Sequence, residues 1–176
     1  MSIVTAPVRD VMEILSSPNK TFRLFRYDDE KYSTWRKHLL EDELHVSDEH
    51  RNEKYITMML ENILFGQGLS IVYEICEMAG ILAFLEVIPG FKCALAWQFW
   101  DKTAWSKGGK SRVRDARELI KYIMDEFDLV RIGTRTADPR VVKLARMLGF
   151  EIEGLAKNDF KWGGKLYDIH IMGMTR

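Results

Sequence analysis

The chain has 176 residues, with 26 basic and 26 acidic side chains, and 47% of its residues are hydrophobic. This composition predicts a folded domain with its own core and excludes a disordered chain. The balanced charge gives no general reason to expect nucleic acid or an anionic membrane as partner. No apolar run approaches the ~18 residues of a membrane span, and the N-terminus MSIVTAPVRD does not resemble a signal peptide. We therefore expect one cytoplasmic domain over residues 1–176, with Cys76 and Cys93 reduced.

The N-terminal part of the chain predicts helices around one short strand. Residues 1–20 form a helical extension, with the helix itself over Pro7–Ser17. The alternating run Thr21–Arg26 predicts a strand, and Asp28–Leu40 predicts a second helix. A third helix is expected to begin after an N-cap at Ser47, to run to Phe65 and to stop at Gly66.

The middle of the chain predicts three neighbouring antiparallel strands. The runs LSIVYEIC, ILAFLEVI and FKCALAWQFW are apolar and rich in β-forming residues, and the turns EMAG and PG separate them. Connections this short join only antiparallel neighbours, so the three runs form a meander. The third run is apolar on both sides, which predicts a central strand that is covered on both faces.

The C-terminal part predicts helix, strand, helix and a final hairpin. Apolar residues at helical spacing cover Val113–Phe127, and Leu129–Thr134 predicts a strand. Asp138 as N-cap and Pro139 at the first helical position open the next helix, which Gly149 ends. The runs FEIEGLAK and KLYDIHIMGM flank a WGG turn and predict a terminal hairpin. The order of elements is that of an α+β domain with a mixed central sheet and helices on both faces.

The stretch AWSKGGKS (104–111) fits a relaxed phosphate-loop pattern. A nucleotide hydrolase also needs an Asp that holds Mg²⁺ at the end of a neighbouring parallel strand. The later run LVRIGT carries no terminal Asp, and only 65 residues follow Ser111, too few for further parallel units. The preceding meander is also unlike a phosphate-loop domain, so the sequence argues against nucleotide hydrolysis.

The stretch DPRVVKLARMLGFEIEGLAKNDFKWGGKLYDIHIMGM (138–174) resembles the C-terminal signature of the GNAT superfamily of acyl-CoA-dependent N-acyltransferases. Within that superfamily it is most similar to the ribosomal-protein N-terminal acetyltransferases. The matching features are Asp138, Leu148–Phe150, Glu153–Gly154, Gly163–Gly164 and Asp168. The resemblance covers the chain from about Thr21 onward. It implies a GNAT-like sheet, acetyl-CoA as cofactor and a primary amine as acceptor, such as a protein N-terminus.

The resemblance also implies where the cofactor would lie. The family places a Gly-containing turn between its fourth strand and the next helix, where backbone N–H groups and the helix dipole hold pyrophosphate. The residues that correspond in this chain are Ser106, Lys107, Gly108, Gly109, Lys110 and Ser111, together with Asp138. The preceding strand, through Leu95–Trp100, would splay from LVRIGT and admit the pantetheine arm.

Three positions depart from the family pattern. The loop has Lys110 or Ser111 where the family prefers Gly or Ala, Asp138 stands for Asn, and Ala145 stands for a Tyr that acts as general acid. These positions serve the cofactor or proton transfer, so the sequence predicts an eroded cofactor site on a retained fold. Glu86, near the end of a central strand, is the candidate base; a solvated carboxylate without catalytic work is the alternative. The histidines share no metal-ligand spacing, so no metal site is expected.

The residues around Trp105–Tyr122 are also similar to small GNAT-like proteins of tailed bacteriophages, which are virion or head-assembly components. That resemblance implies a non-catalytic assembly factor with a protein partner, in the host cytoplasm. The sequence therefore predicts an acetyl-CoA-dependent N-acetyltransferase-like protein, with the assembly factor as the alternative.

Overall fold

The computed structural model of the chain describes residues 18–41 and 46–176. The N-terminal helix expected over Pro7–Ser17 lies outside these residues. Within them, no helix is both long and apolar enough to cross a membrane.

The described strands form one mixed sheet, whose order is β1-β2-β3-β4-β5-β7-β6. Their bounds are β1 Phe22–Leu24, β2 Ile71–Ile75, β3 Gly80–Ile88, β4 Lys92–Phe99, β5 Arg131–Thr136, β6 Glu151–Trp162 and β7 Lys165–Thr175. Strands β1 to β4 pair antiparallel in sequence, as the short turns predict. Strand β5 pairs parallel with β4 and antiparallel with β7, which also pairs with β6. The predicted mixed α+β sheet and the three-stranded meander are confirmed.

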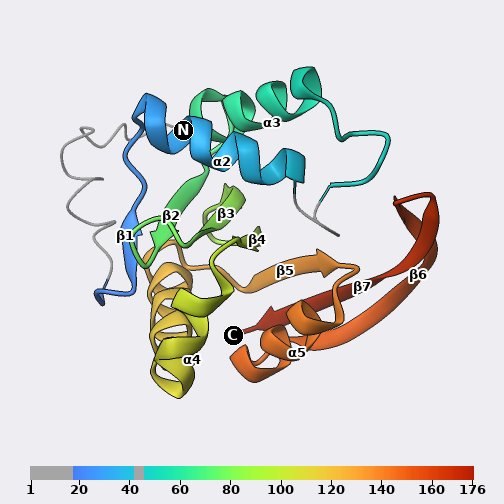
Figure 1. The fold of residues 1–176 in the computed structure, drawn as a ribbon. Helices are drawn as coiled ribbons and strands as arrows, with labels where there is room; N and C mark the ends of the chain where they lie inside the picture. Colours follow the sequence, from blue (N-terminus) through green and yellow to red (C-terminus); the bar gives the residue numbers. More distant parts are fainter. Residues whose placement is uncertain (1–17, 42–45) are drawn as a thin grey trace.

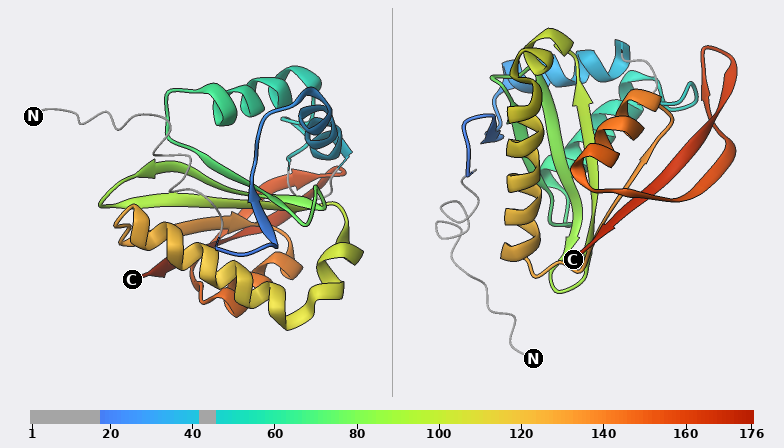
Figure 2. Two further views of the ribbon diagram at one scale, coloured as in Figure 1. Left: turned by 90° about the vertical axis from the view of Figure 1, so that its left-hand side faces the viewer. Right: turned by 90° about the horizontal axis from the view of Figure 1, so that it is seen from below.

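Helices cover both faces of the sheet (Figures 1 and 2). Helices α2 (Asp29–Glu41) and α3 (Glu53–Phe65) lie over one face, and α4 (Lys102–Glu126) and α5 (Pro139–Leu148) lie over the other. Each face has its own core, because side chains alternate across a strand. Trp35, Ile56 and Leu60 are central to the core under α2 and α3, whereas Phe84, Leu119 and Ile123 are central to the core under α4 and α5.

Strand β4 is central but is not covered on both faces, contrary to the prediction. Cys93, Leu95 and Trp97 are buried under α4 and α5, whereas Ala94 and Ala96, on the opposite face, are exposed. Alternation along the strand puts these alanines on the face of α2 and α3. Two small side chains in an apolar run look buried in the sequence, yet the helices leave them open.

The start of α3 also differs from the prediction. Its N-cap is Asn52 and not Ser47, since the Asn52 side chain accepts a hydrogen bond from the Tyr55 backbone N–H at 2.9 Å. The cause is a long-range contact: the Asp48 carboxylate accepts hydrogen bonds from the backbone N–H groups of Gly163 and Gly164, each at 3.0 Å. This contact occupies the Ser47 region before the helix begins. The predicted stop at Gly66 is confirmed.

The Asp48 contact fastens the tip of the β6–β7 hairpin to the connection between α2 and α3. Gly163 and Gly164 have φ of 57° and 75°, the left-handed conformation of a tight hairpin turn. The Asp48 N–H also donates to the Lys161 carbonyl at 2.8 Å, and the Arg51 guanidinium lies 5.8 Å from the centre of the Trp162 ring. In Figure 1 the hairpin projects beyond β5 toward the helices α2 and α3. We call these contacts the hairpin clasp.

The hairpin clasp is expected to open in acid. The Gly164 N–H, then the Gly163 N–H, lower the pKa of Asp48 below its ordinary 3.8. A carboxyl whose pKa is lower in the folded state stabilises that state above its ordinary pKa, and the contribution disappears as pH falls through the folded value. Amide exchange at Gly163 and Gly164, corrected for intrinsic rates, should therefore accelerate below about pH 3.8. Asp48→Ala should exchange faster above about pH 3.8 and should approach the unmodified protein in stronger acid. Equal protection in both proteins at neutral pH would contradict the clasp.

Candidate functional site

The site begins where β4 and β5 separate. The two parallel strands pair only at Lys92–Ala94 and Arg131–Gly133, although β4 continues to Phe99 and β5 to Thr136. This confirms the expected splaying. The carboxyl ends of parallel strands lie at the same edge of the sheet, so α4 and α5, which follow them, both begin at this edge. The opening therefore faces two helix N-termini, whose partial positive charge favours an anion.

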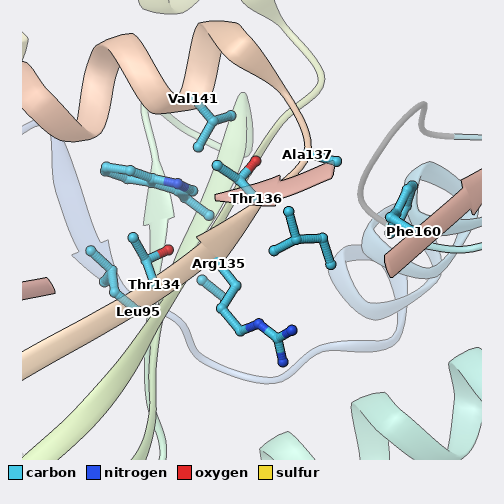
Figure 3. Close-up of a pocket in the computed structure, with 10 residues that line it drawn as sticks. Leu95, Thr134, Arg135, Thr136, Ala137, Val141 and Phe160 are labelled. Carbon is cyan, nitrogen blue, oxygen red and sulfur yellow. The ribbon is translucent and has the colours of Figure 1, made fainter. Parts of the chain in front are cut away.

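A cavity of about 320 Å³ occupies the opening, and we call it the interstrand cavity. Figure 3 shows Val141 of α5 on one side of β5 and Phe160 of β6 beyond its end. Because side chains alternate along β5, Arg135 lies on the opposite face from Thr134 and Thr136, and all three line the cavity. The cavity thus passes through the sheet. Its lining residues are Leu95, Ala96, Trp97, Thr134, Arg135, Thr136, Ala137, Val141, Phe160 and Ile169.

Trp97 contributes a buried polar group to the interstrand cavity. Its side chain is 6% exposed, and its ring packs 6.4 Å from the rings of Phe99 and Phe150. The Trp97 Nε1–H is buried and has no hydrogen-bond partner among the described residues. A buried donor without an acceptor is costly, so a ligand acceptor at this place would be stabilising. The sequence shows Trp97 only as a member of an apolar run.

A second cavity of about 150 Å³ lies on the face of α2 and α3, and we call it the apolar cavity. It shares Ala96 and Trp97 with the interstrand cavity, so the two spaces meet at β4. Its lining residues are Trp35, Leu39, Val46, Met59, Ile63, Ile81, Ala83, Leu85, Ala96, Trp97 and Gln98. The exposed Ala96 of β4 is the sequence signal for this space, because it leaves room that a larger side chain would fill.

The predicted cofactor loop is part of a helix. Helix α4 begins at Lys102, before the loop, and is broken only at Gly109, where φ is 48° and ψ is −129°. The hydroxyl of Ser111 donates to the Gly108 carbonyl at 2.8 Å, and that of Ser106 donates to the Thr103 carbonyl at 3.1 Å. The backbone conformation at Gly109 belongs essentially to glycine. The structure thus places these loop residues together at a kink that precedes the long segment of α4.

The kink exposes positive charge, but the space beside Gly108 is filled. Lys107, Lys110 and Ser111 are exposed, whereas the Arg112 side chain fills the space beside Gly108, so that a Cβ there would meet Arg112 Nε at 2.0 Å. The buried Arg112 Nη1 has no hydrogen-bond partner among the described residues. None of the residues 106–111 lines the interstrand cavity.

Asp138 lies beside the interstrand cavity, but its carboxylate accepts hydrogen bonds from the helix that it caps. It is 3% exposed and caps α5, as predicted, by accepting a hydrogen bond from the Arg140 N–H at 2.8 Å. The Arg140 guanidinium also donates to the carboxylate through Nε, at 2.9 and 3.0 Å. The neighbouring Ala137 lines the cavity.

Glu86 and the cysteines lie outside the site. Glu86 is exposed and has φ of 51° at a bulge in β3, opposite the paired end of β4, and it lines neither cavity. Burial raises the pKa of Cys93 to about 12, so its thiol is not a nucleophile at neutral pH. Burial also raises the pKa of Cys76, against the opposite effect of Arg112 beside it.

The kink at Gly109 gives a stability prediction. A Cβ at Gly109 would meet nothing within 4 Å, so the cost of Gly109→Ala is conformational and not steric. We expect it to lower the free energy of unfolding by about 1–3 kcal/mol, measured by urea denaturation. Gly68 also has open space but lacks a positive φ, so Gly68→Ala is the matched control and should change stability by less than about 0.5 kcal/mol. Equal effects of the two changes would contradict the kink.

No protein-family model and no curated protein matches the sequence. Solved structures do match. A ribosomal L7/L12 alpha-N-protein acetyltransferase in complex with coenzyme A has a TM-score of 0.66 at 18% identity, over 89% of this chain and 95% of that one. A spermidine N-acetyltransferase from Vibrio cholerae, in complex with CoA and spermine, has 0.65 at 14% identity, over 89% and 96%.

A GNAT-family acetyltransferase from Bacillus anthracis has a TM-score of 0.64 at 12% identity, over 89% of this chain and 95% of that one. These neighbours are acetyltransferases, and a phage virion or head-assembly role finds no support among them. At such identities the similarity establishes architecture and not activity. The chain has the GNAT fold.

Proposed function

We propose that the chain is an acetyl-CoA-dependent N-acetyltransferase that acts on a primary amine. The observation that carries the proposal is the opening between β4 and β5, with a cavity of about 320 Å³ at the edge where α4 and α5 begin. Two of the neighbours that share the fold have CoA bound. The resemblance of residues 138–174 to the acyltransferase signature points to the same activity.

The polar groups of the opening suit the pantetheine arm, which carries amides. Beyond Ala94 and Gly133, the facing edges of β4 and β5 pair with no strand in the part of the chain that the structure describes, so their backbone groups need other acceptors and donors. Trp97 Nε1 adds a buried donor to the same space. The residues present therefore fit an extended ligand with both hydrogen-bonding capacities.

The phosphates would be held at the kink of α4. Lys107 and Lys110 supply exposed positive charge there, and the helix segment after Gly109 supplies its N-terminal dipole. Because Arg112 covers Gly108, charge contributes more to binding than a glycine cradle does. In our proposal the eroded loop therefore binds the phosphates mainly through charge. Cofactor binding should then weaken as the salt concentration rises.

In this reaction the protein itself need not form a covalent bond with either substrate. Acetyl-CoA supplies the acetyl group as a thioester; the reaction replaces its C–S bond by a C–N bond, the amine loses a proton and the departing sulfur gains one. The chain's own part is to orient the amine toward the opening at Ala96 and Trp97, where the two cavities meet. Because Glu86 lines neither cavity, the amine proton passes to water in our proposal.

Acetyl-CoA should raise the melting temperature. Ligand that binds only the folded state stabilises it by mass action, so the shift should be clear at about 1 mM. Trp97→Phe keeps an aromatic ring but removes the donor, and should weaken the affinity about 3–10-fold. Trp162→Phe, at the hairpin tip and outside both cavities, is the matched control. Absence of any shift in the unmodified protein would overturn the proposed function.

Glu86→Gln separates the two routes for the amine proton. Because Glu86 lines neither cavity, we expect water to take the proton and kcat to fall by less than about threefold. A general base in direct contact contributes about 10²–10⁴ in rate. A loss of that size, with the acetyl-CoA melting shift intact, would make Glu86 the base.

A further inference from the structure

We infer that the acceptor amine is carried by an apolar group about the size of a benzene ring, and that this group occupies the apolar cavity. The inference rests on the proposed function and names its substrate class. The acceptor can be a free amine or the N-terminus of a peptide whose first side chain is apolar, since both present the same chemistry.

The apolar cavity is placed to hold an acceptor beside the acyl group. It lies on the face of α2 and α3, and it meets the interstrand cavity at Ala96 and Trp97. Because Ala96 lines both spaces, an amine attached to a group in the apolar cavity would lie next to the opening between β4 and β5. The two reactants would approach from opposite faces of the sheet.

The size of the apolar cavity follows from a pair of alanines. Ala83 of β3 lies directly opposite Ala96 of β4 in the antiparallel register, so two methyl groups stand where larger side chains would fill the space. The resulting volume is about 150 Å³. A closed apolar cavity of this volume accepts benzene in another protein. Here the exposed Ala96 leaves the space open to solvent, so an acceptor can enter.

The described lining disfavours a polyamine. Among the described residues that line the apolar cavity, the polar atoms come from Gln98 and from the indoles of Trp35 and Trp97, and none of these residues carries a carboxylate. The nearby buried carboxylate of Glu74 is already paired with Lys31 Nζ at 2.6 Å. A second ammonium group in the apolar cavity would lose its water without gaining a counter-charge, which is costly. We therefore expect an acceptor unlike the spermine that the Vibrio cholerae neighbour has bound.

The first experiment compares acceptors with the full chain. Acetyl transfer from acetyl-CoA is measured with 2-phenylethylamine, with a short peptide amide that begins with Phe, with ethanolamine and with spermidine. We expect kcat/KM for at least one of the first two to exceed the values for ethanolamine and spermidine by about 10-fold to 100-fold. Which of the two is preferred separates a free amine from a peptide N-terminus.

The outcomes are distinguishable from failure of the proposed function. If acetyl-CoA raises the melting temperature but spermidine or ethanolamine reacts as well as the apolar acceptors, or if none reacts, the apolar acceptor is wrong. If acetyl-CoA gives no shift, the proposed function itself is wrong. A titration of intrinsic tryptophan fluorescence with 2-phenylethylamine alone gives a readout without turnover, because Trp35 and Trp97 line the cavity.

The second experiment fills the apolar cavity. Ala83→Leu should reduce kcat/KM for the apolar acceptor at least about 10-fold, with the melting shift by acetyl-CoA retained, because Ala83 lines only the apolar cavity. Ala94→Leu adds the same side chain to the same face but outside both cavities, and should change little. If Ala83→Leu does not fold, Met59→Phe fills the space from α3. Unchanged acceptor kinetics in the folded filling variant would overturn the inference.

Discussion

The site depends on the pairing between β4 and β5, which stops after three residues. Parallel pairing at Lys92–Ala94 holds the two strands in one sheet, and its end leaves their last residues apart. A sheet interrupted in this way has unpaired backbone groups in its middle, which need partners. It also brings two helix N-termini to one edge. The interstrand cavity lies in that interruption, and the buried Trp97 donor lies beside it.

The same strand separates the two halves of the proposed reaction. On β4, the large residues Leu95 and Trp97 face α4 and α5, whereas Ala94 and Ala96 face α2 and α3. Alternation of large and small side chains therefore gives one face a packed core beside the interstrand cavity and the other face an apolar cavity. The hairpin clasp at Asp48 fixes the far end of β6 and β7 to the segment that leads into α3. The hairpin supplies Phe160 and Ile169 to the interstrand cavity, and Val46, just before Asp48, lines the apolar cavity.

Local signals in the sequence were sufficient for much of this fold. Asp138–Pro139 and Gly149 bound α5 correctly because a cap depends on adjacent residues, and short turns predicted the meander. Ser47 was wrong as a cap because hydrogen bonds from Gly163 and Gly164, more than a hundred residues away, decide that segment. The cofactor loop over Ser106–Ser111 was predicted from the family resemblance, yet these residues belong to helix α4, which is broken at Gly109. The roles of Trp97 and Ala83 could be recognised only from the strand register in the structure.

We place acetyl-CoA in the opening between β4 and β5, and backbone amide NMR with and without the cofactor can test this placement. We expect shifts concentrated at Leu95–Trp97 and Thr134–Ala137, with smaller changes at the kink of α4 and none in β1 and β2. Shifts that avoid both β4 and β5 at saturating acetyl-CoA would contradict it.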